Sequence, residues 1–141
     1  MPGNELIDYK ELKEVKKIFT ESDGVLFAHG FDKRRKNIFR VRKFEKKISE
    51  AFGSKYVQCV SSGTAAIKIA LKSLGVKHGD EVITQSFNFI ATIEAILDCG
   101  AKPIITGINN DLNMSADELS KLITKKTKAV ILVHMLGYSA E

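Results

Sequence analysis

The segment Val60–Leu71, with the sequence VSSGTAAIKIAL, contains the residues best suited to bind a charged group. Two serines and a glycine follow an apolar stretch, and a threonine begins a helical pattern. The first N–H groups of a helix have no partner within it and carry partial positive charge. Ser62, Gly63 and Thr64 are therefore candidates to hold a phosphate through backbone N–H groups and hydroxyls. The pattern equally fits a helix cap, in which Ser62 or Thr64 accepts a backbone hydrogen bond.

The turn at residues 61–64 differs from the two common nucleotide-binding patterns. A dinucleotide-binding fold has G-x-G-x-x-G at this point, and a P-loop has G-x-x-x-x-G-K-[ST]. This turn has a single glycine, Gly63. The sequence thus favours a different ligand that carries a phosphate.

A second group of interest is the aromatic pair in the segment QSFNF at residues 85–89. A ring at this position could stack on a planar cofactor. Both rings could equally be core side chains, and we expect that of Phe87. Phe89 begins a helix whose later residues are mostly small or apolar, so its ring could face either way.

The hydrophobic pattern predicts the elements that position these residues. Helical spacing covers Glu5–Glu21 and Arg40–Phe52, with Gly53 at the expected helix end, and Ser22–Asn37 between them reads as a loop. From Lys55 onward, short β-rich runs alternate with helical ones. We expect strands at 55–60, 81–85, 102–108 and 128–134, and helices at 65–74, 89–99 and from Ser115, which forms a capping box with Glu118.

This alternation predicts an α/β fold with a mostly parallel sheet and helices on both faces. The strand at 128–134 is nearly all apolar, so we expect it to be buried on both faces. Ligands of such sheets bind beyond the carboxyl ends of the strands. Four segments are expected there: residues 61–64, 86–89 and 107–113, and the residues after His134.

Composition places the 141-residue chain among globular proteins, because 44% of its residues are hydrophobic. No apolar stretch approaches the ~18–20 residues of a membrane helix. The polar start lacks the apolar run of a secretory signal. Cys59 and Cys99 lie far apart in apolar segments, which suggests neither a disulfide framework nor a zinc site. We expect a cytoplasmic protein without a membrane partner.

The net charge of +5 comes mostly from one segment near the N-terminus. A solvated loop and helix face is the simplest interpretation of this charge. A non-catalytic nucleic-acid-binding protein is an alternative, although no DNA- or RNA-binding motif accompanies the segment. Its basic residues are Lys33, Arg34, Arg35, Lys36, Arg40, Arg42, Lys43, Lys46 and Lys47.

Five short motifs follow one another in fixed order: S-G-T-A-A, G-D-E-V-I, F-I-A-T, G-A-x-P and V-H-x-x-G. Together they resemble the DegT/DnrJ/StrS sugar aminotransferases, which are fold-type-I enzymes that depend on pyridoxal 5′-phosphate (PLP). The resemblance extends from about Val41 to the last residue. It implies that residues 41–141 are an incomplete PLP-binding large domain of βαβαβαβ order, preceded by an N-terminal helix and basic loop in residues 1–40.

The resemblance also implies roles for individual residues. Ser62, Gly63 and Thr64 match the turn that holds the cofactor phosphate, and Phe89 matches the aromatic residue that stacks on the pyridine ring. His134 matches a family histidine, for which we expect a structural hydrogen bond. The complete enzyme is expected to be a homodimer. It would transfer an amino group, typically from glutamate, to a keto sugar carried on a nucleotide.

The sequence departs from the family pattern in two places. Gly107 stands after the third expected strand, where the family usually has an acidic residue. The chain also lacks the segments with the pyridine-nitrogen aspartate and the Schiff-base lysine, which PLP chemistry requires. We therefore expect an N-terminal fragment that has no catalytic residue of its own, binds PLP weakly or not at all and is inactive alone.

Two further consequences and one alternative follow from the resemblance. A first strand without its later neighbours would leave an apolar edge, so the isolated chain is expected to be marginally stable and prone to associate. The basic segment could lie near a substrate diphosphate. A PLP-dependent sugar dehydratase of the same superfamily, which places a histidine at the lysine position, is an alternative to the aminotransferase.

Overall fold

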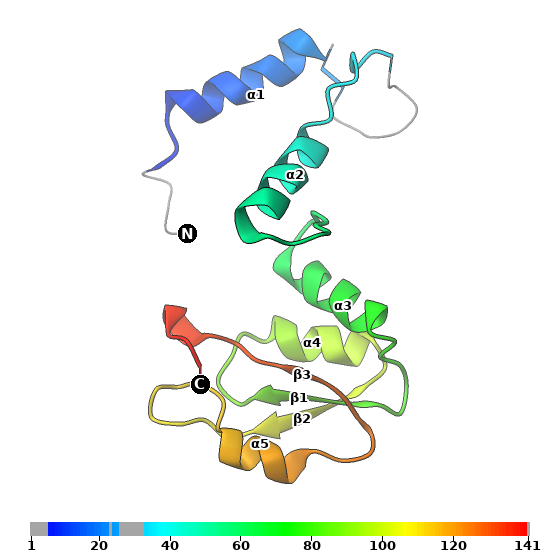
Figure 1. Cartoon of the computed structure of the whole chain (residues 1–141), viewed down its shortest axis with the longest axis vertical. Coiled ribbons are helices and arrows are strands. Elements are labelled where there is room, and N and C mark those ends of the chain that lie inside the picture. Colours follow the sequence, from blue (N-terminus) through cyan, green and yellow to red (C-terminus); the bar gives the residue numbers. More distant parts are fainter. Residues whose placement is uncertain (1–5, 23, 26–32, 141) are drawn as a thin grey trace. The chain divides into compact units, whose positions relative to one another are not determined.

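The computed structural model describes residues 6–22, 24–25 and 33–140. The chain divides into two compact units, Met1–Cys59 and Val60–Glu141 (Figure 1). The sequence predicts a division after residue 40, which concerns the domains of a complete enzyme and stays a prediction. Most of the predicted loop at 22–37 lies outside the described residues.

The first unit contains two helices, of which the first has a side-chain cap at its start and the second has none. Helix α1 (Tyr9–Glu21) begins after Asp8, whose carboxylate accepts from the Lys10 N–H, while Glu11 accepts from the Asp8 N–H. This capping box explains why the helix begins later than the predicted residue 5. Helix α2 (Arg40–Phe52) has the predicted bounds, and Gly53 ends it in the left-handed conformation at φ 66°.

The second unit is a three-stranded parallel sheet with helices on both faces. The strands are β1 (Glu81–Gln85), β2 (Lys102–Thr106) and β3 (Thr127–Ile131), in the order β2-β1-β3. Helix α4 (Ala91–Asp98) covers one face and α5 (Ala116–Leu122) the other (Figure 1). Helix α3 (Gly63–Ser73) packs on α4, and a short 3₁₀ turn, η2 (Met135–Gly137), follows β3. The predicted fold class is confirmed.

The core of this unit lies around the central strand. Val82 and Ile83 of β1 point to opposite faces and are both completely buried. β1, rather than the apolar strand at 128–134, is therefore the strand buried on both faces. That prediction is wrong because β3 lies at the sheet edge, where Val130 is 42% exposed. The main apolar cluster consists of Leu71, Val76, Val82, Ile96, Cys99 and Ala101.

The predicted first strand, Lys55–Val60, does not form. Residues 55–60 join no sheet in the described part of the chain, and the Tyr56 side chain is 82% exposed. A strand needs the backbone groups of a neighbour, and here the Cys59 N–H instead donates to the Glu45 carboxylate at 2.8 Å. The order βαβαβαβ is thus corrected to three strands in the described residues.

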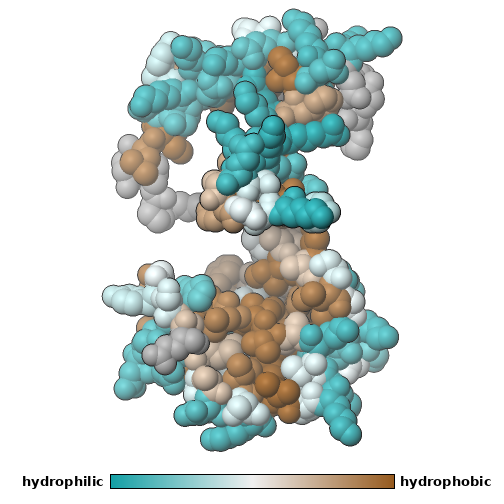
Figure 2. All heavy atoms as spheres, viewed as in Figure 1, coloured by the Kyte–Doolittle hydropathy of each residue, from teal (hydrophilic) through white to brown (hydrophobic). Residues whose placement is uncertain are grey.

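Apolar side chains gather over much of the visible face of the second unit, whereas the visible face of the first is more polar (Figure 2). Large exposed apolar residues of the second unit include Ile69, Phe89, Ile90 and Leu132. The buried core holds the three strands in place. Ligands of parallel sheets bind beyond the carboxyl ends of the strands, so a site is expected there.

Candidate functional site

The candidate site lies where the parallel strands of the second unit end. Figure 1 shows that α3 and α4 both begin on the side toward which the strand arrows point. The turn before α3 carries Ser62, Gly63 and Thr64, and the loop before α4 carries Phe89. Helix α3 packs against α4, so the two predicted segments begin neighbouring helices.

Ser62 is the N-cap of α3. Its backbone is extended, and its Oγ accepts a hydrogen bond from the Ala65 N–H at 3.1 Å. The helix-cap interpretation of this serine is therefore confirmed. A capping oxygen acts as acceptor, so its hydroxyl proton stays available for a second partner.

The turn also offers backbone donors. The Gly63 and Thr64 N–H groups are the first two of α3, and within the described residues neither has an acceptor. A Cβ built at Gly63 would meet no atom within 4 Å, so the space in front of the turn is open. Two N–H groups, two hydroxyls and the positive end of a helix form a donor set that fits a phosphate.

The two phenylalanines of the loop after β1 are both exposed. Phe89 is 76% exposed, so its ring is available to stack on a ligand, and that role stays a prediction. Phe87 is 43% exposed, and the expectation that it belongs to the core is wrong. The buried Gln85 amide donates to the Phe87 carbonyl at 3.1 Å, so the backbone of Phe87, and not its ring, is bonded to the interior.

Gln85 is a residue that the sequence analysis missed. It ends β1 and is completely buried. Its Nε2 donates to the carbonyls of Phe87 at 3.1 Å and Leu112 at 3.2 Å, and its Oε1 accepts from the Val133 N–H at 3.1 Å. One amide thus ties together the segments that follow all three strands. Its signal was a polar side chain at the end of the apolar run EVITQ, at a position that the strand period buries.

Asn113 makes a second brace between the same segments. Its side chain is 1% exposed, its Nδ2 donates to the Asp111 carboxylate at 3.0 Å, and its Oδ1 accepts from the Met135 N–H at 3.1 Å. The hydrogen bonds from Asn113 also hold the pKa of Asp111 below its ordinary value. The loop after β2 is therefore fastened to the turn after β3.

Gly107 follows β2, at the position where the resemblance leads to the expectation of an acidic residue. Its N–H donates to the Glu118 carboxylate at 2.8 Å, so the strand ends at Thr106 rather than at the predicted residue 108. The predicted capping box is half correct. The Ser115 Oγ accepts from the Glu118 N–H at 3.4 Å, but the Glu118 side chain binds Gly107 instead of Ser115.

His134 has the structural role predicted for it. Its Nδ1 accepts from the Ala140 N–H at 3.0 Å, which assigns the ring proton to Nε2 when the imidazole is neutral. This bond closes the segment around η2.

The described residues hold no group of three side chains that could bind a metal ion. In the same residues, no helix has the length and apolar character to cross a membrane.

Comparison with known proteins identifies the family. The profile of the DegT/DnrJ/EryC1/StrS aminotransferase family matches residues 33–141. The chain belongs to this family. The match begins before Val41, where the resemblance was expected to start, and so it includes the basic segment from Lys33 onward.

Individual proteins resemble this chain in sequence and in fold. GDP-perosamine synthase from Vibrio cholerae is 36% identical over 102 residues, which are 72% of this chain and 28% of that protein. The PMP-form of Spr1654 from Streptococcus pneumoniae matches 96% of this chain and 32% of its own, with a TM-score of 0.82 and 28% identity. NtdA from Bacillus subtilis, solved with bound PMP, matches 99% of this chain and 31% of its own, with a TM-score of 0.83 and 33% identity.

The chain therefore spans about a third or less of the length of these DegT-family proteins. The structures of Spr1654 include a PLP-form as well as the PMP-form. The matches cover the open turn before α3 and the loop before α4, which contain the predicted site residues.

Proposed function

We propose that this chain is the cofactor-phosphate-binding part of a PLP-dependent aminotransferase that acts on a keto sugar carried on a nucleotide, with glutamate as the amino donor. The observation that carries the proposal is the open N-terminus of α3 in a member of the DegT family: the Gly63 and Thr64 N–H groups have no acceptor among the described residues, and a Cβ at Gly63 would meet no atom within 4 Å. We place the protein in the cytoplasm and propose a homodimer for the complete enzyme.

The residues of the turn act on the phosphate. The N–H groups of Gly63 and Thr64 and the hydroxyls of Ser62 and Thr64 donate hydrogen bonds to its oxygens, and the helix dipole favours its negative charge. Gly63 allows close approach of a phosphate to the backbone, because it has no side chain and the space where its Cβ would lie is open. Together they fix the position of the cofactor while its reactive end stays free.

Phe89 acts on the ring of the cofactor. Its exposed side chain offers an apolar face against which a planar ring can pack. When bound, PLP supplies an electron-withdrawing ring that stabilises negative charge on the substrate carbon. The braces made by Gln85 and Asn113 hold the neighbouring loops, so Phe89 projects from a backbone that is already ordered.

The remaining chemistry belongs to residues outside this chain in our proposal. The lysine that holds the cofactor and the aspartate that keeps its ring nitrogen protonated are supplied by the rest of the complete protein. The 141-residue chain alone is then inactive, with weak PLP binding at most.

Covalent labelling tests this proposal. Borohydride reduction of the complete protein with PLP is expected to modify one lysine outside residues 1–141, and the protein should transfer an amino group from glutamate to a nucleotide-linked keto sugar. The same treatment of the 141-residue chain should modify no single lysine selectively. Specific labelling of one lysine within residues 1–141, together with turnover, would refute the division of roles. Labelling at a downstream site with dehydration instead of transfer would favour the dehydratase alternative.

A further inference from the structure

A cavity that no role above explains lies within the first unit. Its volume is about 590 Å³, and its lining includes Arg35, Phe39, Arg40, Arg42 and Gln58. Apolar side chains such as Ile18 and Ile38 complete the lining. A cavity with guanidinium groups, an amide and apolar walls has the mixed character of small-molecule sites.

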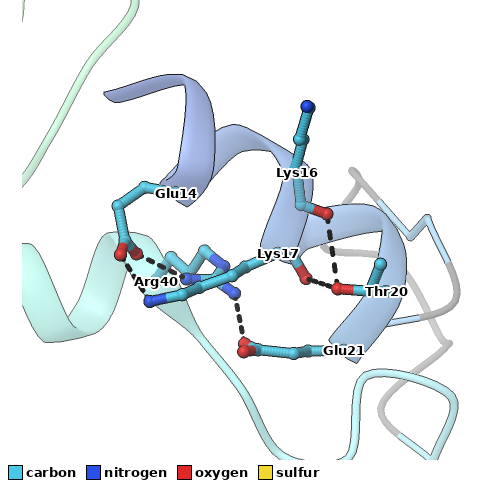
Figure 3. Close-up of polar contacts among 6 residues, drawn as sticks. All are labelled: Glu14, Lys16, Lys17, Thr20, Glu21 and Arg40. Carbon is cyan, nitrogen blue, oxygen red and sulfur yellow. Dashed lines mark hydrogen bonds and ion pairs between the residues drawn. The ribbon is translucent and has the colours of Figure 1, made fainter. Parts of the chain in front are cut away.

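The three arginines of this cavity differ in their partners. Arg40 is neutralised by α1, because its Nη2 lies 2.7 Å from the Glu21 carboxylate and its Nη1 lies 3.7 Å from that of Glu14 (Figure 3). Arg35 and Arg42 have no carboxylate within 4.0 Å in the part of the chain that the structure describes. Glu45 also lies on the lining, and its carboxylate accepts from the Cys59 N–H at 2.8 Å. Arg35 and Arg42 are therefore not ion-paired within the described residues, and the lining has more guanidinium groups than carboxylates.

Both of these arginines converge on one aromatic ring. The guanidinium carbons of Arg35 and Arg42 lie 5.6 Å and 4.6 Å from the centre of the Phe39 ring. The Arg35 Nε is buried and has no partner among the described residues. Stacking on an aromatic ring holds a guanidinium plane in a fixed orientation and leaves its edge free for a bidentate acceptor.

The start of α2, which lines the cavity, adds further positive charge. The first turn of α2 contains arginines and no acidic residue, and Phe39 provides no side-chain cap. Cations at a helix start are unfavourable, so an anion near them would relieve repulsion. Lys36 and Asn37, in the turn between Arg35 and Phe39, both have left-handed backbones, at φ 53° and 59°.

We propose that this cavity binds the phosphate or diphosphate group of a phosphorylated small molecule, through the guanidinium groups of Arg35 and Arg42. Guanidinium groups bind phosphate oxygens through paired, charge-assisted hydrogen bonds. Gln58 lies on the lining and can bind a polar group attached to the phosphate. If the phosphorylated molecule is the nucleotide-linked sugar, its identity rests on the proposed function.

Calorimetric titration of inorganic pyrophosphate and of GDP into the 141-residue chain at low salt tests the site. Both ligands are expected to bind. Arg35→Gln and Arg42→Gln should each weaken binding by about tenfold or more, which is the loss of one strong charged hydrogen bond. The matched control is Arg34→Gln, which removes the same charge at the neighbouring exposed residue outside the cavity and should weaken binding less than about threefold.

Three results would overturn the inference. Absence of pyrophosphate and GDP binding to the wild-type chain would do so. Equal losses of pyrophosphate affinity in Arg34→Gln and Arg35→Gln would also overturn it, because they would indicate diffuse electrostatic attraction to the basic segment. A single-stranded oligonucleotide used as a probe would then bind in the same way. Loss of pyrophosphate binding in Thr64→Val but not in Arg35→Gln would move the phosphate to the turn before α3.

Two controls keep these outcomes separate from misfolding and from failure of the PLP proposal. Circular dichroism checks the helix content of each variant, and Arg35→Lys, which keeps the charge, should retain more pyrophosphate affinity than Arg35→Gln. The pyrophosphate titration needs no PLP. A complete protein that binds no PLP would therefore refute the proposed function while leaving this site to be judged by its own titration.

Discussion

The Glu118 carboxylate accepts a hydrogen bond from the Gly107 N–H at 2.8 Å, across the loop between β2 and α5. A Cβ at position 107 would lie 2.2 Å from the Glu118 Oε2, so the contact in this form requires glycine. The Glu118 carboxylate thus occupies the space in which a side chain at position 107 would begin.

Gly107→Ala should displace the Glu118 side chain rather than the backbone, because Glu118 is exposed and its carboxylate can rotate away. The expected cost is that of one hydrogen bond, about 0.5–1.5 kcal/mol in the free energy of unfolding, measured with urea. Gly63→Ala is the control on the steric argument, because open space surrounds a Cβ at that position. If Gly107→Ala costs nothing, or if its cost simply adds to that of Glu118→Ala, the two residues are not coupled.

Removing the Gln85 amide should be more damaging. Gln85→Leu leaves two carbonyls and one N–H without their buried partner, and we expect a loss of about 2–4 kcal/mol in unfolding free energy. Gln58→Leu, at an exposed glutamine, should change stability by less than about 0.5 kcal/mol. Similar losses in both variants would contradict the role of Gln85 as a brace.

Gln85→Glu should make stability depend on pH. A carboxylate cannot donate to the Phe87 and Leu112 carbonyls, and burial raises the pKa of such a group. The protonated acid keeps one donor. The deficit of the variant relative to the wild type should therefore grow as pH rises through that pKa, which paired urea unfolding at pH 5 and pH 8 would measure. A deficit independent of pH would argue against the buried donor role.

The Asp111 carboxylate should stabilise the fold at neutral pH and lose this contribution at acid pH. The Asn113 hydrogen bonds lower its pKa in the folded state, so the carboxylate stabilises the fold above its unfolded pKa of about 4. That contribution is lost as pH falls through the lower folded pKa. The difference in unfolding free energy between the wild type and Asp111→Asn should shrink over the same range. An NMR titration that places the Asp111 pKa at or above about 4 would contradict this account.

Much of the fold was predictable because local signals and tertiary packing agree. Gly53 ends α2 as expected, and the buried run at 81–85 becomes the central strand. Residues 55–60 show the opposite case. Their β propensity is real, but a strand forms only where a neighbour supplies backbone partners, and propensity contains no information on that neighbour.

The sequence motif of the candidate site was predictable, but the buried hydrogen bonds that hold the surrounding loops were not. The turn at Ser62–Thr64 has a recognisable composition and sits where expected at the start of α3. The roles of Gln85 and Asn113 depend on bonds to residues more than twenty positions away, such as Leu112 and Met135, which a local pattern cannot reveal. The Glu118 side chain bonds to Gly107, eleven positions away, instead of to its expected capping partner Ser115, and the capping pattern gives no sign of that choice.

The central claim is that the turn before α3 holds the cofactor phosphate, and comparing PLP with pyridoxal in the complete protein tests it most directly. Thr64→Val should weaken PLP binding by about tenfold or more and leave pyridoxal binding nearly unchanged, because only PLP carries the phosphate. Thr20→Val, at an exposed threonine of α1, serves as the matched control and should change neither affinity. Equal weakening of PLP and pyridoxal by Thr64→Val, or no weakening of either, would contradict the account.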